Sequence, residues 1–522
     1  MYRQTGTNED GTMTQKAITA ALDLKANSAD VATKAYVNNA IANIPSGGGS
    51  GMPSGISNLG IDSAGKIVVV GPDGTIQAGD ATEAAIIAAL IKSGSYTADG
   101  TVGLTIDYVN KSYERTQDAA NYRMGADFNR YSMYGGRMRC NVADDGTINA
   151  FYGDADYVED GSNGQVMVYQ PKFYYQRTFI NETVGSRGTI INKESIILST
   201  EPRAGFKLHP LFQSGNEELD YVLLPAYEGS VYDVSKNEYL LTNNSGVSFT
   251  EDKLSSIAGA KPLNGLNNTM NPERMNQLAV NRGEGWHLTT FEAESALQML
   301  EIVEFGTMNG QTALEKGIVN ISRTSNADCS AITGSTASLG NTSGAAASTI
   351  IDNDGTRTTY TAVGSRAISY RGMENPWGNV WRLVGNLTTR GGGNSAGGIP
   401  YLNNTTPLNV TLPAASSSWI SAMGYANVTY DWAYLPIECA TTANSAVPVG
   451  DTLWTLSQLN GENIIGIGGI CNSGDGAGPF NISADVSARN SFRYFNGRLM
   501  FIPIKDSIYT ANITKWQQHY GG

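Results

Sequence analysis

The chain has 522 residues, of which 41% are hydrophobic and only 16% are charged, and its formal net charge at pH 7 is −13. A chain of this length exceeds what one compact core can hold, so several domains are expected. The acidic balance disfavours nucleic-acid binding, because an acidic surface repels phosphate backbones. The longest apolar runs, such as residues 84–91, are too short for insertion into a membrane.

The first 45 residues predict a helix. Val37, Ile41 and Ile44 follow helical i, i+4, i+7 spacing within residues 13–44, and Pro45 ends the pattern. One helix cannot bury so thin an apolar stripe alone. Residues 1–45 are therefore expected to associate with copies of the chain or to dock on a larger body, with a loosely structured tail as the alternative.

A hinge and a small module follow. Residues 46–59 are rich in Gly and Ser and predict a flexible hinge. Residues 60–119 predict a β/α spacer module, with a strand at 67–70 between two turns and a short helix at 81–92. Residues 101–114 fit either a helix or a pair of strands.

Residues 120–204 predict a β-rich module, and residues 205–522 a large C-terminal domain. In the β-rich module, a strand at 133–139 and a partner at 147–152 flank the turn at 143–146 and form a hairpin.

The large domain contains the clearest predicted helix, at 290–303, which Thr289 or Thr290 caps. Residues 323–366 and 386–420 have few large apolar side chains and predict long surface excursions. The predicted fold class is α+β, with a helical N-terminal anchor, small β modules and the large C-terminal domain.

Three short segments carry most of the information in the large domain. They are GWHLTTFEAE at 285–294, ENPWGNVW at 374–381 and FRYFNGRLMF at 492–501. In this order they resemble the landmarks of the C-type-lectin-like fold, in the variety shared by formylglycine-generating enzymes and the variable receptor-binding proteins of phages. The resemblance implies that residues 205–522 form such a domain. It assigns scaffold roles to Trp286, Trp377, Gly378, Asn379 and Trp381.

A second resemblance covers the N-terminal 45 residues. DGTMTQKAIT at 10–19 and ATKAYV at 32–37 resemble segments that recur in phage tail-fibre and head-fibre proteins. This resemblance implies a virion-anchoring end. No secretion signal follows Met1, so a protein that acts outside the cell is expected to leave its cytoplasm by lysis.

The sequence contains no recognisable catalytic motif. Cys439 and Cys471 are the candidates for the copper-binding pair of the formylglycine-generating enzymes, but no His or Lys beside them lowers a thiol pKa. No hydrolase elbow, P-loop or zinc motif occurs. The cysteines are expected to be small buried hydrophobes, and the histidines lie in unrelated segments. These residues are Cys140, Cys329, Cys439 and Cys471, and His209, His287 and His519.

Two acidic clusters could be functional sites, but each is also explained as a turn. Asp154 and Glu159 lie in a cluster that could supply the two carboxylates of a glycoside-cleaving enzyme, although Asp-Gly turns explain it more simply. Asp352 and Asp354 precede Gly355 as in a calcium loop, but the distal Glu is missing and a solvated turn is favoured. The chain is therefore predicted to be no enzyme and to need no metal or cofactor.

The segment between 472 and 496 is rich in Asn, Asp, Ser and aromatic residues. This composition is typical of adaptable paratopes, in which Tyr supplies rigid contact area and Asn and Ser supply hydrogen bonds. The phage proteins that this domain resembles, when diversified by retroelements, have their variable receptor-binding segment at this place in the fold. The resemblance therefore implies that residues 472–496 bind a receptor, and an ordinary surface loop is the alternative. The predicted receptor-binding residues are Asn472, Ser473, Asp475, Asn481, Ser483, Asp485, Arg489, Asn490, Phe492, Tyr494 and Asn496.

These features predict a phage fibre or tail-tip protein, located in the virion, that binds a host cell-surface glycan or protein without chemistry. Insertions near 390–430 are expected to contribute contacts. The resemblance implies a homotrimer that also contacts other virion structural proteins. The alternatives are a structural head-fibre or decoration protein, or an enzyme of the formylglycine-generating or glycoside-cleaving type.

Overall fold

The computed structural model describes most of the chain beyond residue 100. The described ranges are 100–242, 245–264, 270–321, 330–351, 355–391, 396–440, 449–455, 461–487 and 494–521. Nearer the N-terminus it describes the strands β1 (Asn58–Ile61), β2 (Ile67–Val70) and β3 (Ile76–Ala78), which form an antiparallel sheet. This confirms the strand predicted at 67–70. The helices predicted at 13–44 and 81–92, residues 46–57 of the predicted hinge, and the acidic turn at 352–354 lie outside the described residues. The last two residues of the predicted hinge, 58 and 59, are instead the start of β1.

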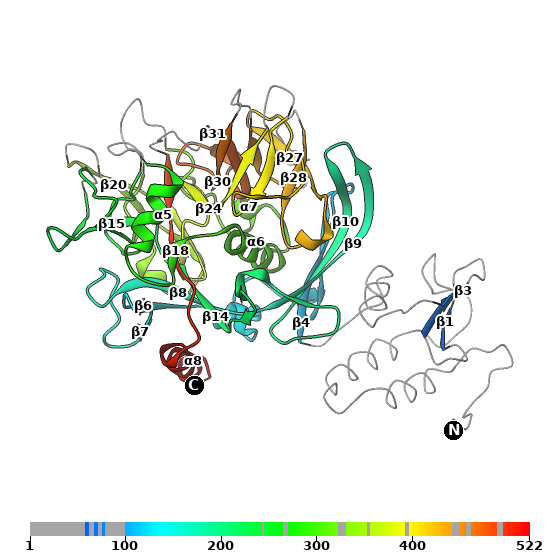
Figure 1. Cartoon of the computed structure of the whole chain (residues 1–522), viewed down its shortest axis with the longest axis horizontal. Helices are drawn as coiled ribbons and strands as arrows, with labels where there is room; N and C mark the ends of the chain where they lie inside the picture. The colour runs from blue at the N-terminus through cyan, green and yellow to red at the C-terminus, as the bar shows by residue number, and fades with distance from the viewer. Residues whose placement is uncertain are drawn as a thin grey trace.

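The predicted α+β class is wrong, because the described chain is mostly β (Figure 1). Within the described ranges, helices of eight or more residues are limited to α5 (Pro272–Val280), α6 (Phe291–Phe305) and α8 (Ser507–Tyr520). The α+β prediction gave the helical N-terminal segment too much weight. Abundant Gly and Asn turns allow many short strands, and these dominate the fold.

A 14-stranded sheet contains most of the long strands. Its main path is β11-β9-β10-β27-β29-β31-β30-β24-β25-β26, with β4, β5, β28 and β32 attached beside it. The strands of the path are, in that order, β11 (Lys207–Leu208), β9 (Tyr174–Gly185), β10 (Gly188–Ser199), β27 (Ser418–Tyr425), β29 (Thr452–Trp454), β31 (Gly478–Ser487), β30 (Glu462–Gly468), β24 (Trp381–Arg390), β25 (Ile399–Leu402) and β26 (Thr406–Pro407).

This sheet runs across the boundaries predicted at 119/120 and 204/205. Strand β10 pairs with β4 (Thr101–Asp107) on one side of these boundaries and with β27 on the other. The undecided region at 101–114 is a strand pair, β4 with β5 (Ser112–Gln117).

A six-stranded sheet joins the first and third landmark segments. Its order is β18 (Trp286–Leu288), β33 (Leu499–Phe501), β14 (Tyr221–Pro225), β8 (Gln165–Pro171), β6 (Met138–Val142) and β7 (Ile148–Phe151). Trp286 lies opposite Phe501 in the register, with ring centroids 4.9 Å apart. The predicted hairpin is confirmed as β6 and β7, but its first strand covers Met138–Val142 rather than 133–139, and Ser132–Gly135 form the short helix α4. Helix α8 packs on this sheet, where Trp516 stacks on Tyr169.

Helix α6 lies in the middle of the body, as Figure 1 shows. It is the helix predicted at 290–303, and the Thr290 hydroxyl caps it by accepting a hydrogen bond from the Ala293 N–H. Nearly all of its residues are buried, including Glu294, Glu301 and Glu304. Buried carboxylates need charged or hydrogen-bonding partners, and for two of these three glutamates the partner is an arginine on a neighbouring segment. Glu294 pairs with Arg382, and Glu304 pairs with Arg371.

The second landmark is a tight turn in the core. Trp377 is fully buried, and its indole N–H donates to the Lys316 carbonyl at 3.0 Å. Gly378 has a φ of 78°, and a Cβ there would lie 2.6 Å from the Ile318 carbonyl oxygen. Only glycine allows this approach without displacing the backbone. Asn379 follows with a φ of 63°, and its side chain bonds to the backbone N–H of Ala331.

The predicted surface excursion at 323–366 is partly wrong. It contains a hairpin of β20 (Ser348–Ile351) and β21 (Arg357–Tyr360), and Ile350 is fully buried. The other elements are short. They are β12 (Gln213–Ser214), β13 (Glu217–Glu218), β15 (Ser230–Asp233), β16 (Glu238–Leu240), β17 (Lys253–Ser255), α4 (Ser132–Gly135), α7 (Gly310–Ala313), β19 (Gly344–Ala346), β22 (Ala367–Tyr370), β23 (Met373–Glu374), β28 (Leu435–Ala440) and β32 (Phe495–Gly497).

Candidate ligand-binding surface

The eleven predicted receptor-binding residues fall into three groups. Arg489, Asn490 and Phe492 lie outside the described residues. Five are at least partly open to solvent: Asn472, Ser473, Asp475, Asp485 and Tyr494. Three are buried: Asn481, Ser483 and Asn496.

The buried three hold the fold together. The Asn496 side chain accepts from the Gly229 N–H and donates to the carbonyls of Gly229 and Leu263. The Asn481 amide donates to Thr452, and the Ser483 hydroxyl donates to Asp485 at 2.7 Å. A partner cannot reach these buried side chains in this conformation, so they are left out of the candidate surface.

The backbone of the turn at 471–477 is held on both sides by interior segments. Cys471 donates its N–H to the Asn379 carbonyl, and its own carbonyl accepts from the Ile321 N–H at 2.7 Å. Gly474 donates to the Val319 carbonyl at 2.9 Å. The Gln311 amide donates to the carbonyls of Gly474 and Ala477. The turn therefore presents its side chains from a fixed backbone.

The outward side chains of this turn are polar. Asn472 and Asp475 are exposed, and Asp475 forms an ion pair with Lys316 at 2.6 Å. The Asp475 side chain is 68% exposed, so this ion pair contributes little to stability and can exchange its partner for a ligand group.

A second exposed feature lies on the 14-stranded sheet beside the turn. Trp454 on β29 is 41% exposed and lies opposite Ser483 of β31 in the register. Its indole N–H donates to the partly exposed Asp485. Burial raises the pKa of Asp485, and the hydrogen bonds from Ser483 and Trp454 oppose that rise. Trp419 on β27 is also partly exposed and pairs with Thr452, two residues before Trp454.

Thr452 connects the two features. Its hydroxyl donates to the Gly476 carbonyl at 3.2 Å at the end of the turn, and it precedes Trp454 on the same strand. The turn and the sheet face are thus linked through Thr452, and their exposed or partly exposed residues Asn472, Asp475, Trp419, Trp454 and Asp485 together define the candidate surface.

The two tryptophans were not among the site residues predicted from the sequence. The available signal is the alternation of a strand: Leu453 and Ile420 are core residues, so Trp454 and Trp419 beside them project to the opposite face. The region predicted to contribute, 390–430, does contain Trp419.

The prediction that the cysteines act only as small buried hydrophobes is wrong for Cys471, which is disulfide-bonded. Its position directly before the exposed turn gives the turn a covalent anchor. Cys140 and Cys439 are free thiols, and burial raises the pKa of Cys439 to about 12. A thiol with so high a pKa is a poor nucleophile.

The two carboxylates considered for glycoside cleavage have partners within the fold. Asp154 accepts from the Phe151 N–H and lies 3.2 Å from His519. Glu159 pairs with the buried Arg139 and accepts from the Tyr227 hydroxyl. Among the described residues, no three His, Cys, Asp or Glu side chains gather in a metal-binding arrangement. The described helices include none that is both long and apolar enough for a membrane crossing.

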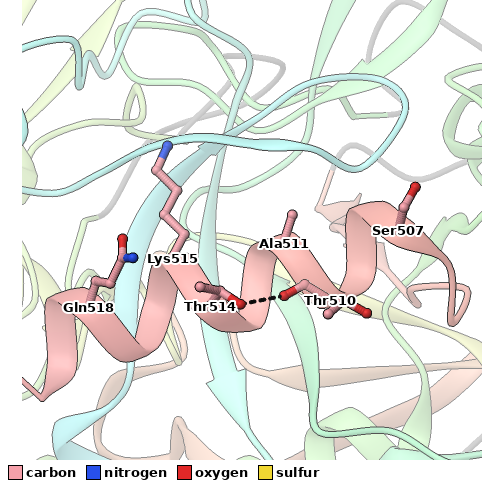
Figure 2. Close-up of a pocket in the computed structure, with 6 residues that line it drawn as sticks. All are labelled: Ser507, Thr510, Ala511, Thr514, Lys515 and Gln518. Atoms are coloured by element: carbon pink, nitrogen blue, oxygen red, sulfur yellow. Dashed lines mark hydrogen bonds between the residues drawn. The ribbon is translucent and has the colours of Figure 1, made fainter.

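A shallow groove follows the outer face of α8 and is shown in Figure 2. Small and polar side chains line it: Ser507, Thr510, Ala511, Thr514, Lys515 and Gln518. Lys515 extends from the helix to the Ile148 carbonyl, 3.1 Å away. No aromatic side chain is among the lining residues, so we place the candidate surface at the turn and sheet face instead.

Comparison with known proteins gives remote structural likenesses alone. No protein-family model and no curated protein matches the chain. Among solved structures, the chain is similar to the Major Tropism Determinant P3c variant, at 11% identity over 87% of this chain and 95% of that chain, with a TM-score of 0.22. It is also similar to the U1 variant, at 12% identity over 87% and 98%, with a TM-score of 0.25. Similarities this weak do not indicate a function, which must come from the residues of this chain.

Proposed function

We propose that this chain is a phage virion protein that attaches to a molecule on the host cell surface by binding without chemistry. The candidate surface makes the contact. The N-terminal resemblance to phage fibre proteins supports a place in the virion, and several copies would add avidity to a weak single contact.

One observation carries this proposal: the turn at 471–477 combines a held backbone with exposed polar side chains. The backbone bonds to Asn379, Ile321 and Val319 fix the turn before any ligand arrives. A preordered turn loses little conformational entropy on binding, which favours affinity. The side chains of Asn472 and Asp475 are exposed and can contact a ligand without breaking a buried interaction.

The disulfide at Cys471 supports action outside the cell. Disulfides persist in oxidising surroundings and are rare in a reducing cytoplasm. A virion protein released by lysis meets such surroundings, and the bond then stabilises the segment that would meet the host.

Direct binding of the purified full-length protein to host cells tests the proposal. We expect saturable binding that blocks adsorption of the phage. The Asp475→Ala variant should bind about tenfold more weakly if Asp475 is a central contact. Glu217→Ala is the matched control, because Glu217 is 67% exposed and pairs with Lys505 as Asp475 is 68% exposed and pairs with Lys316. A protein that does not bind cells or block adsorption is a structural virion component instead.

A further inference from the structure

We propose that Trp419, Trp454 and Asp485 form a subsite for one sugar ring of a neutral glycan. This inference rests on the proposed attachment function and names the chemical class of its ligand. The subsite lies on the outer face of three neighbouring strands, β27, β29 and β31.

The register places the three side chains on one face of the sheet. Trp454 pairs with Ser483, and Trp419 pairs with Thr452. Core residues alternate with them on each strand: Ile420 on β27, Leu453 on β29, and Ile482, Ala484 and Val486 on β31. Side chains alternate between the faces of a strand, so Trp419, Trp454 and Asp485 project away from the core.

Trp454 offers an apolar platform to solvent. Large aromatic side chains contribute most to stability when buried, yet Trp454 is 41% exposed. The face of an indole carries negative electrostatic potential. The axial C–H groups of a pyranose carry slight positive charge and match this face. A sugar ring would therefore cover apolar surface that the fold leaves uncovered.

Asp485 supplies hydrogen-bond acceptors beside this platform. Its carboxylate already accepts from the Ser483 hydroxyl at 2.7 Å and from the Trp454 indole N–H. A carboxylate can accept about four hydrogen bonds, so acceptor positions remain for sugar hydroxyls. The two existing bonds also fix the carboxylate and the indole relative to each other, which reduces the entropy lost on binding.

The charge of the surface selects a neutral glycan. Strands β27, β29 and β31 contain no Lys or Arg, and Asp485 is the acidic group that faces the platform. The whole chain carries a net charge of −13. A sialylated or sulfated glycan would meet the Asp485 carboxylate, and these three strands offer it no cation to pair with, which costs binding free energy.

Titration of the full-length protein with a panel of neutral and sialylated oligosaccharides tests this subsite, with tryptophan fluorescence and calorimetry as readouts. We expect neutral oligosaccharides to bind and to shield an indole from a soluble quencher. Trp454→Ala should weaken binding about tenfold or more, and Trp454→Phe, which keeps an aromatic face, should weaken it less. Asp485→Asn should also weaken binding, because it removes the charged acceptor. Tyr152→Ala, which truncates another exposed aromatic (36%), should leave it unchanged.

The outcomes separate this inference from the proposed function. Absence of binding to every neutral oligosaccharide, or equal affinity of Trp454→Ala and the unmodified protein, overturns the subsite. If the protein still binds host cells after their neutral glycans are removed, the attachment function stands and its receptor is a protein. If the protein binds oligosaccharides but neither binds host cells nor blocks phage adsorption, the subsite stands and the attachment function fails.

Discussion

Arg382 on β24 and Glu294 on α6 form a buried ion pair with two hydrogen bonds, at 3.2 and 2.7 Å. Both side chains are at most 4% exposed. The pair joins the central helix to the strand that follows the tryptophan turn. The arginine found here is explained by its carboxylate partner, 88 residues earlier in the chain.

Breaking this pair should destabilise the protein strongly. Glu294→Gln leaves the Arg382 guanidinium buried without its counter-charge, so we expect a loss of about 3–5 kcal/mol in the free energy of unfolding. Urea denaturation measures it. The control Glu217→Gln removes an exposed charge and should cost less than about 1 kcal/mol. An equal loss of unfolding free energy in the two variants would show that the buried ion pair stabilises the protein no more than an exposed one does.

Adding a Cβ at Gly378 should lower the free energy of unfolding by more than the positive φ of this residue alone would. Gly378 and Gly259 have nearly the same φ, 78° and 80°, but nothing lies within 4 Å of a Cβ built at Gly259. At Gly378 that Cβ would lie 2.6 Å from the Ile318 carbonyl oxygen. Gly378→Ala should therefore lower the free energy of unfolding by about 1–3 kcal/mol more than Gly259→Ala.

Thermal or urea unfolding of these two alanine variants gives the comparison directly. The Gly259 variant reports the cost of a positive φ, and the difference between the variants reports the collision. If the two alanines cost the same, the close approach at the tryptophan turn is not a constraint on the fold.

His209 should make the protein less stable in acid. Burial lowers its pKa from 6.5 to about 3, where its Nδ1 accepts from the Leu211 N–H. Below pH 6.5 the unfolded chain binds a proton that the folded chain rejects. Stability therefore falls as the pH drops from 6.5 towards 3, by up to about 1.4 kcal/mol per pH unit from this group.

The variant His209→Asn keeps a hydrogen-bond acceptor and removes the titration. The free energy of unfolding of both proteins is measured from pH 7 to pH 4, and the contributions of the shared carboxylates cancel in the difference. We expect the unmodified protein to lose stability faster. Parallel curves would mean that folding does not lower the pKa of His209.

Glu301 should act in the opposite direction. Burial, with help from Glu294 and Glu304, raises its pKa from 4.5 to about 8, against the opposing effect of Arg382 and Arg137. The folded chain keeps a proton that the unfolded chain releases above pH 4.5. This group therefore reduces stability as the pH rises from 4.5 to 8.

The variant Glu301→Gln keeps the shape of the protonated side chain without its titration. Its stability relative to the unmodified protein should increase with pH by up to about 1.4 kcal/mol per unit and level off above pH 8. Urea denaturation across this range measures the difference. A difference that does not change with pH would show that the Glu301 pKa is not raised.

Local patterns along the chain predicted the elements whose causes are local. The cap at Thr290 and the apolar stripe behind it placed α6, and turn residues placed the hairpin of β6 and β7 and the strand at 67–70. These signals are sufficient because capping and turn formation depend on residues a few positions apart.

Tertiary packing decided the class of the fold and the members of the candidate surface. Strand β10 pairs with β27, more than 200 positions later, and no local pattern specifies such a partner. Composition predicted Asn481 and Ser483 as receptor-binding residues, but the packed structure shows that both are buried while Trp454 is exposed. Burial depends on which segments meet in space, and that is a property of the whole chain rather than of any one stretch.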